Sequence, residues 1–270
     1  MNTKSRSRSS LDAGLAVRCV LVAALCLACL VARAGEVRVA VATNFLKAMA
    51  TLARDFSERT GHRAVVSGGS TGKLYAQIVA GAPFDVLLAA DDATPRRLEE
   101  EGHGVAGTRY TYAVGRLVLW SADPDRVDAE GAILASDRYR RLAIANPRLA
   151  PYGAAAREVL EARGLLELAG PRIVMGENIG QAFQFVATGN AEIGLVALSQ
   201  VTAPGRQAGG SLWRVPPDLH GEIRQDAVLL ARGVDNEAAR ALLAWLRTPA
   251  ARATIRSFGY DTEPDPGKGR

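Results

Sequence analysis

Short apolar segments alternate with helix-like segments along most of this chain, and this alternation limits the folds that it can adopt. Several of the apolar runs are four to six residues long and end in turn residues or helical patterns, as at 37–42, 85–90, 142–145 and 193–197. A buried run of this length next to a helix is typical of a βαβ unit with parallel strands. The sequence therefore predicts an α/β fold.

The first 34 residues differ from the rest of the chain. Basic residues are spread over 4–18, and an apolar run follows at 20–31, shorter than the about 20 residues that span a bilayer. Residues 32–34 read Ala-Arg-Ala, a small-x-small pattern, so we predict a signal peptide at 1–34 that is cleaved near Ala34. An N-terminal membrane anchor and a lipoprotein site at Cys29 are the alternatives, although the residues before Cys29 fit a lipobox poorly.

Removal of this segment changes the composition. Residues 1–34 hold five Lys or Arg and one Asp, which accounts for +4 of the formal net charge of +5 and leaves about +1. The basic character therefore gives no reason to expect nucleic-acid binding. All three cysteines also lie there, so disulfides, cysteine nucleophiles and cysteine-based metal sites are excluded from the remaining 236 residues. That length suffices for two lobes of about a hundred residues each.

One strand pattern, at 110–121, is unusually long and has Gly115 near its middle. A strand of that length can cross from one lobe to another, and the apolar run at 227–231 can return. The Gly- and Pro-rich residues 203–222 are predicted to form a surface loop. The predicted boundaries are 35–113 and 224–262 for the first lobe, 114–223 for the second, and 263–270 for a disordered tail.

The residues that usually carry catalysis or bind metal do not cluster in this sequence. His62, His103 and His220 each stand beside a glycine without metal-ligand spacing, and no G-x-S-x-G elbow is present. Asp91-Asp92 is interpreted as a helix cap rather than as paired catalytic carboxylates. Residues 67–72 are predicted to form a glycine-rich turn that leads into a helix. The segment 67–74 is not a P-loop, because Ser67 and Leu74 occupy the positions that require Gly and Ser or Thr.

Four predicted strand-to-helix junctions carry small polar residues or free backbone amides. They are Thr43-Asn44, Ser70-Thr71-Gly72, Pro151-Tyr152-Gly153 and Asn178-Ile179-Gly180, two in each predicted lobe. The first N–H groups of a helix have no partner within it, and the helix dipole favours an anion there. Ordinary helix capping is the alternative at each junction taken alone. Together the four junctions indicate an anion site in a cleft between the lobes.

The chemistry of these junctions suits a fully ionised anion. The only basic side chain at them is Lys73, which is expected to point outward. Hydrogen phosphate carries a proton and would need an acceptor carboxylate, which the junctions do not offer. The site is therefore predicted to be neutral and to contain only hydrogen-bond donors.

At these residues the sequence resembles the periplasmic molybdate-binding proteins of ABC transporters. The resemblance covers about 36–260 and implies a periplasmic binding protein type II-like fold, in which two α/β lobes are joined by crossover strands and enclose a ligand cleft. The motifs that carry it are Ala42-Thr43-Asn44-Phe45, Ser70-Thr71-Gly72, Gly81-Ala82-Pro83-Phe84-Asp85-Val86, Ala90-Asp91, Pro151-Tyr152-Gly153, Glu177-Asn178-Ile179-Gly180-Gln181 and residues 189–196, Gly-Asn-Ala-Glu-Ile-Gly-Leu-Val.

The resemblance also implies roles for individual residues. Thr43 would donate its hydroxyl, Asn44 its backbone amide and its side chain, and Thr71 its hydroxyl and amide. Tyr152 and Ile179 would contribute backbone N–H groups. Other members of the family have a tyrosine ligand where Ala197 stands, and Asn44 is the leading candidate for the contact that replaces it. No catalytic residue and no direct protein ligand to molybdenum is implied, because the metal is bound only as its oxyanion.

The sequence thus predicts a periplasmic, monomeric protein that binds molybdate or tungstate, uses no cofactor and delivers the anion to a membrane permease. One alternative is a protein of the same fold that binds sulfate or a small organic anion. Another is an enzyme on this fold, such as porphobilinogen deaminase, which tethers its cofactor through cysteine. The lack of cysteine after residue 34 argues against that enzyme. The export signal and the missing helix-turn-helix argue against the effector domain of a cytoplasmic transcription regulator.

Overall fold

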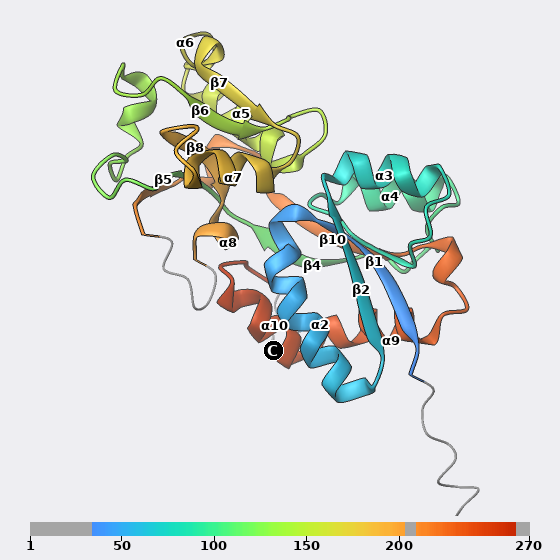
Figure 1. Ribbon diagram of the computed structural model, residues 1–270. Coiled ribbons are helices and arrows are strands. Elements are labelled where there is room, and N and C mark those ends of the chain that lie inside the picture. The colour runs from blue at the N-terminus through green and yellow to red at the C-terminus, as the bar shows by residue number, and fades with distance from the viewer. Residues whose placement is uncertain (1–33, 203–208, 263–270) are drawn as a thin grey trace, which may run out of the picture. The chain divides into compact units, whose positions relative to one another are not determined.

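Two five-stranded mixed sheets organise the chain from Gly35 onward (Figure 1). The computed structural model describes residues 34–202 and 209–262. The three cysteines, residues 1–33 of the predicted signal peptide and the predicted tail at 263–270 lie outside those ranges. Within them, no helix is both long and apolar enough to cross a membrane.

The first sheet has the strand order β2-β1-β3-β10-β4. β1 pairs in parallel with β2 and β3, whereas β10 is antiparallel to both β3 and β4. The parallel pairing confirms the βαβ prediction for the beginning of the chain. The strands are β1 (Glu36–Ala42), β2 (Arg63–Gly69), β3 (Val86–Leu88), β4 (Tyr110–Gly115) and β10 (Ile223–Leu229).

Helices cover both faces of this sheet (Figure 1). Because successive side chains of a strand point to opposite faces, Val39 and Val41 pack with α2, α9 and α10, while Ala40 between them packs with α3 and α4. Gly61 ends α2 in the left-handed conformation, which glycine adopts without strain. The helices are α2 (Leu46–Thr60), α3 (Thr71–Val79), α4 (Ala93–Glu100), α9 (Glu237–Leu246) and α10 (Pro249–Ser257).

The second sheet has the order β7-β6-β8-β5-β9 and lies in the other lobe. Its core continues into α5 and α7, and the ring of Trp120 on β5 stacks on Phe183 of α7 with centroids 5.0 Å apart. The strands are β5 (Leu117–Ser121), β6 (Leu142–Ala145), β7 (Ile173–Gly176), β8 (Ile193–Ala197) and β9 (Ser211–Arg214). The helices are α5 (Pro151–Ala162), α6 (Leu166–Ala169), α7 (Ile179–Ala187) and α8 (Leu198–Val201).

The chain passes from one sheet to the other at Arg116, between the end of β4 and the start of β5. The long strand expected at 110–121 is therefore two strands that belong to different sheets. The chain returns after β9 and enters the first sheet with β10. Two lobes joined by crossover strands are thus confirmed, and the exact boundaries at 113 and 223 stay predictions.

Two local predictions were wrong. Ser211–Arg214, expected within a surface loop at 203–222, forms β9, which pairs antiparallel with β5; residues 203–208 lie outside the described part. Residues 67–69 were expected in a turn but extend β2, where they pair with residues 40–42 of β1. In both cases a neighbouring strand supplies hydrogen bonds that outweigh the turn preference of glycine.

Candidate functional site

A small cavity between the lobes is lined by the predicted site residues from all four junctions. It measures about 10 Å³, close to the smallest volume that admits one water molecule. The structure therefore brings together the five residues that the sequence singled out. The lining residues are Thr43, Asn44, Thr71, Tyr152 and Ile179, together with Ala42, Gly69, Ser70, Ala90, Ala150 and Pro151.

Thr43 reaches the cavity because β1 ends at Ala42 and a 3-10 turn, η1 (Thr43–Phe45), leads into α2. The expected cap is absent, since neither this turn nor α2 has a side-chain cap hydrogen bond. Instead, the Thr43 hydroxyl accepts the N–H of Gly180, from the other lobe, at 3.4 Å. The hydroxyl hydrogen of Thr43 is therefore left to donate elsewhere.

Asn44 is only 4% exposed, and its side chain turns toward the hinge. Its Nδ2 donates to Gln225 Oε1 at 2.8 Å and to the Tyr260 hydroxyl at 3.0 Å. Both amide hydrogens are used by these bonds, so the side-chain contact that was expected to replace a tyrosine at Ala197 is not available in this arrangement. The backbone N–H remains as the contribution of Asn44.

Ser70 and Thr71 stand at the start of α3. Thr71 is 1% exposed, and its hydroxyl accepts the N–H of Ala90 at 3.0 Å, which leaves the hydroxyl hydrogen free to donate. Ser70 is equally buried, yet its hydroxyl has no hydrogen-bond partner among the described residues. The sequence prediction included Thr71 and not Ser70.

The second lobe presents backbone N–H groups from the first turns of α5 and α7. Their neighbours are already engaged, since Gly153 N donates to Ala150 O at 2.8 Å and Gln181 N donates to the Asn178 side chain at 3.0 Å. The N–H groups of Tyr152 and Ile179 have no acceptor within their own helices. At this junction the alternative of ordinary helix capping applies to the side chain of Asn178.

A buried polar network joins the two lobes behind the cavity. Gln225 of β10 is at its centre, with Oε1 accepting from Asn44 and from the Tyr112 hydroxyl, while Nε2 donates to the Tyr152 hydroxyl at 3.1 Å. Burial raises the pKa of Tyr112 and of Tyr152 well above the ordinary tyrosine value. Both hydroxyls therefore stay protonated at neutral pH, and the network carries no charge.

On the far side of Asn44 the network continues to Ser199 of α8. The Ser199 hydroxyl donates to the Asn44 carbonyl at 3.2 Å, and the Tyr260 hydroxyl lies 2.9 Å from Ser199. Sequence reasoning missed Gln225, Ser199 and Tyr260. The available signal was the polar run Arg224-Gln225-Asp226 directly before the apolar residues 227–231; a polar side chain that is buried in such a strand is expected to have a hydrogen-bond partner.

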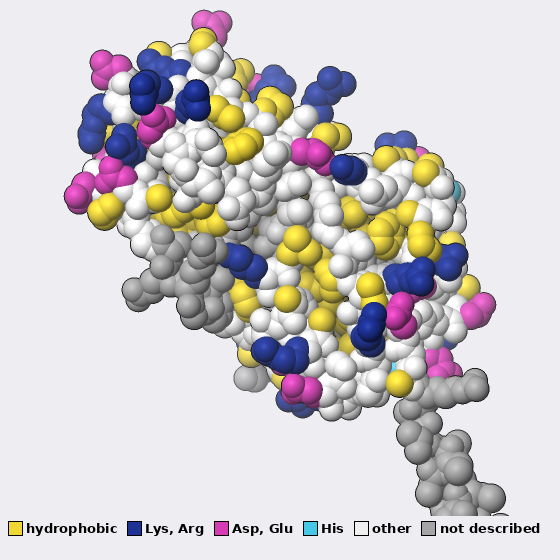
Figure 2. Space-filling model, viewed as in Figure 1, with side chains coloured by type: hydrophobic (Ala, Val, Ile, Leu, Met, Phe, Trp, Pro, Cys, Tyr) yellow, Lys and Arg dark blue, Asp and Glu magenta, His cyan; other side chains and the backbone are white. Residues whose placement is uncertain are grey.

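Charged side chains stay outside the cavity, since none of its described lining residues is acidic or basic. On the face seen in Figure 2, side chains of both signs are scattered over the surface. Lys73 at the start of α3 forms an ion pair of 2.8 Å with Glu177, just before α7, and both side chains are about half exposed. This pair connects the two lobes through an exposed contact.

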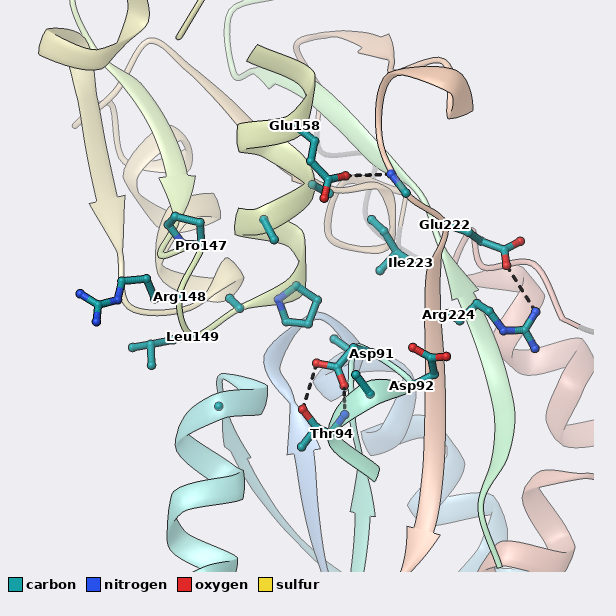
Figure 3. A pocket seen from close by; sticks show the side chains of 18 residues that line it. Asp91, Asp92, Thr94, Pro147, Arg148, Leu149, Glu158, Glu222, Ile223 and Arg224 are labelled. Atoms are coloured by element: carbon teal, nitrogen blue, oxygen red, sulfur yellow. Dashed lines mark hydrogen bonds and ion pairs between the residues drawn. The ribbon is translucent and has the colours of Figure 1, made fainter. Parts of the chain in front are cut away.

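A larger cavity of about 330 Å³ adjoins the small one and shares Ala90, Ala150 and Pro151 with it. Figure 3 shows interactions of Asp91, Glu158 and Glu222 with residues around this cavity. Asp91 accepts the N–H of Thr94 in the first turn of α4 at 2.7 Å, whereas Asp92, directly before that helix, makes no side-chain cap hydrogen bond. Glu158 accepts the N–H of Gly221 at 2.8 Å. Four acidic residues line this cavity together with Arg148 and Arg224, whereas the predicted site contains only neutral donors, so this cavity is a poor candidate for that site.

The described residues also contain no group of three or more His, Cys, Asp or Glu that is arranged to hold a metal ion. The small cavity offers hydroxyls and backbone N–H groups, which donate hydrogen bonds to anionic oxygens. Its chemistry is therefore that of an oxyanion site built from neutral donors.

Comparison with known proteins gives consistent matches over nearly all of the described chain. Residues 37–261 match the family model of the bacterial extracellular solute-binding proteins. The molybdate-binding protein ModA of Azotobacter vinelandii is 56% identical over 87% of this chain and 92% of its own length. ModA of Rhodobacter capsulatus is 50% identical over 86% and 90% of the two chains. A solved periplasmic molybdate-binding protein of Azotobacter vinelandii superposes with a TM-score of 0.82 at 42% identity, covering 85% of this chain and all of that one.

Proposed function

The chain belongs to the ModA family of bacterial extracellular solute-binding proteins, and from this premise we propose that it binds molybdate, and also tungstate, between its lobes. In this proposal the protein is exported, acts as a monomer and delivers the oxyanion to the permease of an ABC importer. It performs no chemistry on the anion and uses no cofactor.

The observation that carries this proposal is the convergence of neutral donors on one buried cavity. Thr43 and Thr71 each offer a hydroxyl hydrogen, because each hydroxyl oxygen already accepts a backbone N–H. Asn44, Thr71, Tyr152 and Ile179 would add backbone N–H groups. A hydrogen bond to a charged group contributes roughly 1.5–3 kcal/mol, so several of them can hold a dianion without any basic side chain.

The size of the cavity supports binding by lobe closure. A space of about 10 Å³ is too small for a tetrahedral oxyanion to enter from solvent. Entry would therefore require the lobes to separate, with the crossover at Arg116 as one of the two connections that bend. Closure would bring the donors of the second lobe onto the anion and present a closed form to the permease.

Sulfate is the alternative ligand, because the same donors serve any tetrahedral dianion. Discrimination between molybdate and sulfate would then depend on the size of the closed cavity, because the type of donor is the same for both anions. Hydrogen phosphate should bind poorly, since the cavity lining described above has no carboxylate to accept its proton.

Calorimetric and thermal-shift titrations of the exported protein with molybdate, tungstate, sulfate and phosphate would test this proposal. A ligand at a hundredfold excess over Kd stabilises the native state by about 2.7 kcal/mol, so molybdate and tungstate should raise the melting temperature clearly. The absence of a shift with either anion at micromolar concentration would refute the assignment. A larger shift with sulfate would favour the alternative.

A further inference from the structure

We propose that the hydroxyl of Ser70 is a further direct donor to the bound oxyanion, an inference that rests on the proposed function. Ser70 lines the small cavity and is 2% exposed. Among the buried side-chain polar atoms of the described residues, its Oγ is one of three without a hydrogen-bond partner. A bound anion would supply that partner.

The energetic argument concerns the unbound protein. A hydroxyl that is buried without a hydrogen bond destabilises the fold, and such groups are rare in native structures. The neighbouring hydroxyl of Thr71 shows the usual situation, since it accepts the N–H of Ala90. The Ser70 hydroxyl thus destabilises the ligand-free protein, and a hydrogen bond to a bound anion would offset that loss of stability.

Helix capping does not account for Ser70. It precedes α3 with the extended backbone that is usual for a cap residue, at φ −70° and ψ 149°, but its side chain makes no cap hydrogen bond. A need for a small side chain does not account for it either, because alanine would fill the same space without burying a hydroxyl. A hydrogen bond from the hydroxyl to a bound ligand explains why position 70 carries a serine.

The position also suits an anion electrostatically. Ser70 and Thr71 lie at the N-terminus of α3, which has nine residues, and the dipole of that helix favours negative charge there. With the Asn44 side chain committed to Gln225 and Tyr260, Ser70 gives the first lobe a third hydroxyl donor, besides Thr43 and Thr71. It thereby adds a contact that the sequence resemblance did not imply.

The test is Ser70→Ala, titrated calorimetrically with sodium molybdate. We expect Kd to rise about ten- to a hundredfold, the range for a hydrogen bond to a charged group. The melting temperature of the ligand-free variant should stay unchanged or rise, because an unsatisfied buried hydroxyl is removed. Ser67→Ala is the matched control, since Ser67 lies three residues away on β2 with an exposed side chain, and it should leave Kd unchanged.

Two outcomes would overturn the inference. Unchanged affinity of Ser70→Ala, with wild-type protein that binds molybdate, would remove Ser70 from the site and leave the proposed function intact. A marked loss of stability in the ligand-free variant would show that the hydroxyl has a partner within the protein. Failure of the wild-type protein to bind either molybdate or tungstate would instead refute the proposed function. Should Ser70→Ala not fold, Ser70→Gly, which removes the hydroxyl and is well tolerated directly before a helix, should raise Kd in the same direction.

Discussion

Thr71 has two hydrogen-bonding roles, and both depend on its hydroxyl. Its oxygen accepts the N–H of Ala90 at 3.0 Å, and its hydrogen is proposed to reach the oxyanion. Thr71→Val removes both, so molybdate binding should weaken by roughly 1.5–3 kcal/mol, and stability should fall because the buried N–H of Ala90 loses its partner. Thr71→Ser keeps the hydroxyl and should retain most of the affinity. Calorimetry and chemical denaturation of both variants measure the two effects, and equal affinities for Val and Ser would exclude Thr71 from the site.

Single residues were predictable to the extent that their roles depend on local sequence. Asn178 follows a strand and precedes a helix, and its side chain caps that helix. Asn44 occupies a similar position, but its side-chain amide donates hydrogen bonds to Gln225 and Tyr260. These partners are separated from Asn44 by 181 and 216 positions in the sequence. Such contacts depend on how the lobes pack, and no local pattern encodes them.

Elements were predicted well where their own periodicity was strong. The strand at 142–145 and the helix that opens at Pro151 agree with β6 and α5. β9 was missed because its four residues follow a Gly- and Pro-rich stretch and gain their hydrogen bonds from β5, which is far away in sequence. A short edge strand of this kind is specified mainly by its partner.

The end of β4 offers a test of how the crossover is packed. A Cβ on Gly115 would overlap the Tyr152 hydroxyl and lie 2.6 Å from Gln225 Nε2. Because Tyr152 is fully buried in the first turn of α5, Gly115→Ala should destabilise the protein by about 1–3 kcal/mol, as overpacking does, and should weaken molybdate binding.

A double-mutant cycle identifies the cause. Tyr152→Phe removes the hydroxyl that the new Cβ would overlap, so the double variant should be more stable than the sum of the two single changes predicts. Denaturation curves of the four proteins give the coupling energy. If the two changes in the free energy of unfolding simply add, Gly115 is required for its backbone conformation and not for the space that it leaves near Tyr152.

The start of α4 carries a carboxylate whose ionisation should reduce stability. Burial raises the pKa of Asp91 in the folded protein. The contribution of the protonated carboxyl to the free energy of unfolding is therefore complete below the ordinary pKa of aspartate, and it is lost as pH rises through the raised pKa. Asp91→Asn can still accept the N–H of Thr94. The variant should therefore be more stable than wild type at pH 7, and the difference should disappear below about pH 4.

Denaturation curves between pH 3.5 and 8 would measure this difference. Asp92→Asn is the control, since its carboxylate is more exposed and pairs with Arg96 at 3.0 Å. A gain in stability for Asp91→Asn that is the same at every pH would show that the ionisation of Asp91 is not its cause.

At the scale of the whole molecule, the described contacts between the lobes fall into two groups around the cavity. The buried network of Gln225, Tyr152 and Asn44 joins the lobes on the side of the crossover strands. Elsewhere, Gly180 N donates to the Thr43 hydroxyl, Gly72 N donates to Leu149 O at 2.9 Å, and Lys73 pairs with Glu177. The contacts of Gly72 and Lys73 join helix α3 of the first lobe to loops of the second without using a crossover strand, so opening would have to break them.

The ion pair of Lys73 and Glu177 is therefore expected to slow release of the anion. Lys73→Gln and Glu177→Gln should each raise the dissociation rate about two- to fivefold, consistent with the up to about 1 kcal/mol that an exposed pair contributes, and added salt should reduce the difference from wild type. If the two side chains act only by attracting or repelling the anion, a different result is expected: loss of the lysine would weaken binding, whereas loss of the glutamate would strengthen it.

Stopped-flow tryptophan fluorescence with molybdate separates the two mechanisms. If the charge-swapped protein, Lys73→Glu with Glu177→Lys, releases molybdate as slowly as wild type, the ion pair itself slows the opening of the lobes. If the two single changes have opposite effects on the dissociation rate, the two residues act only through long-range attraction or repulsion of the anion.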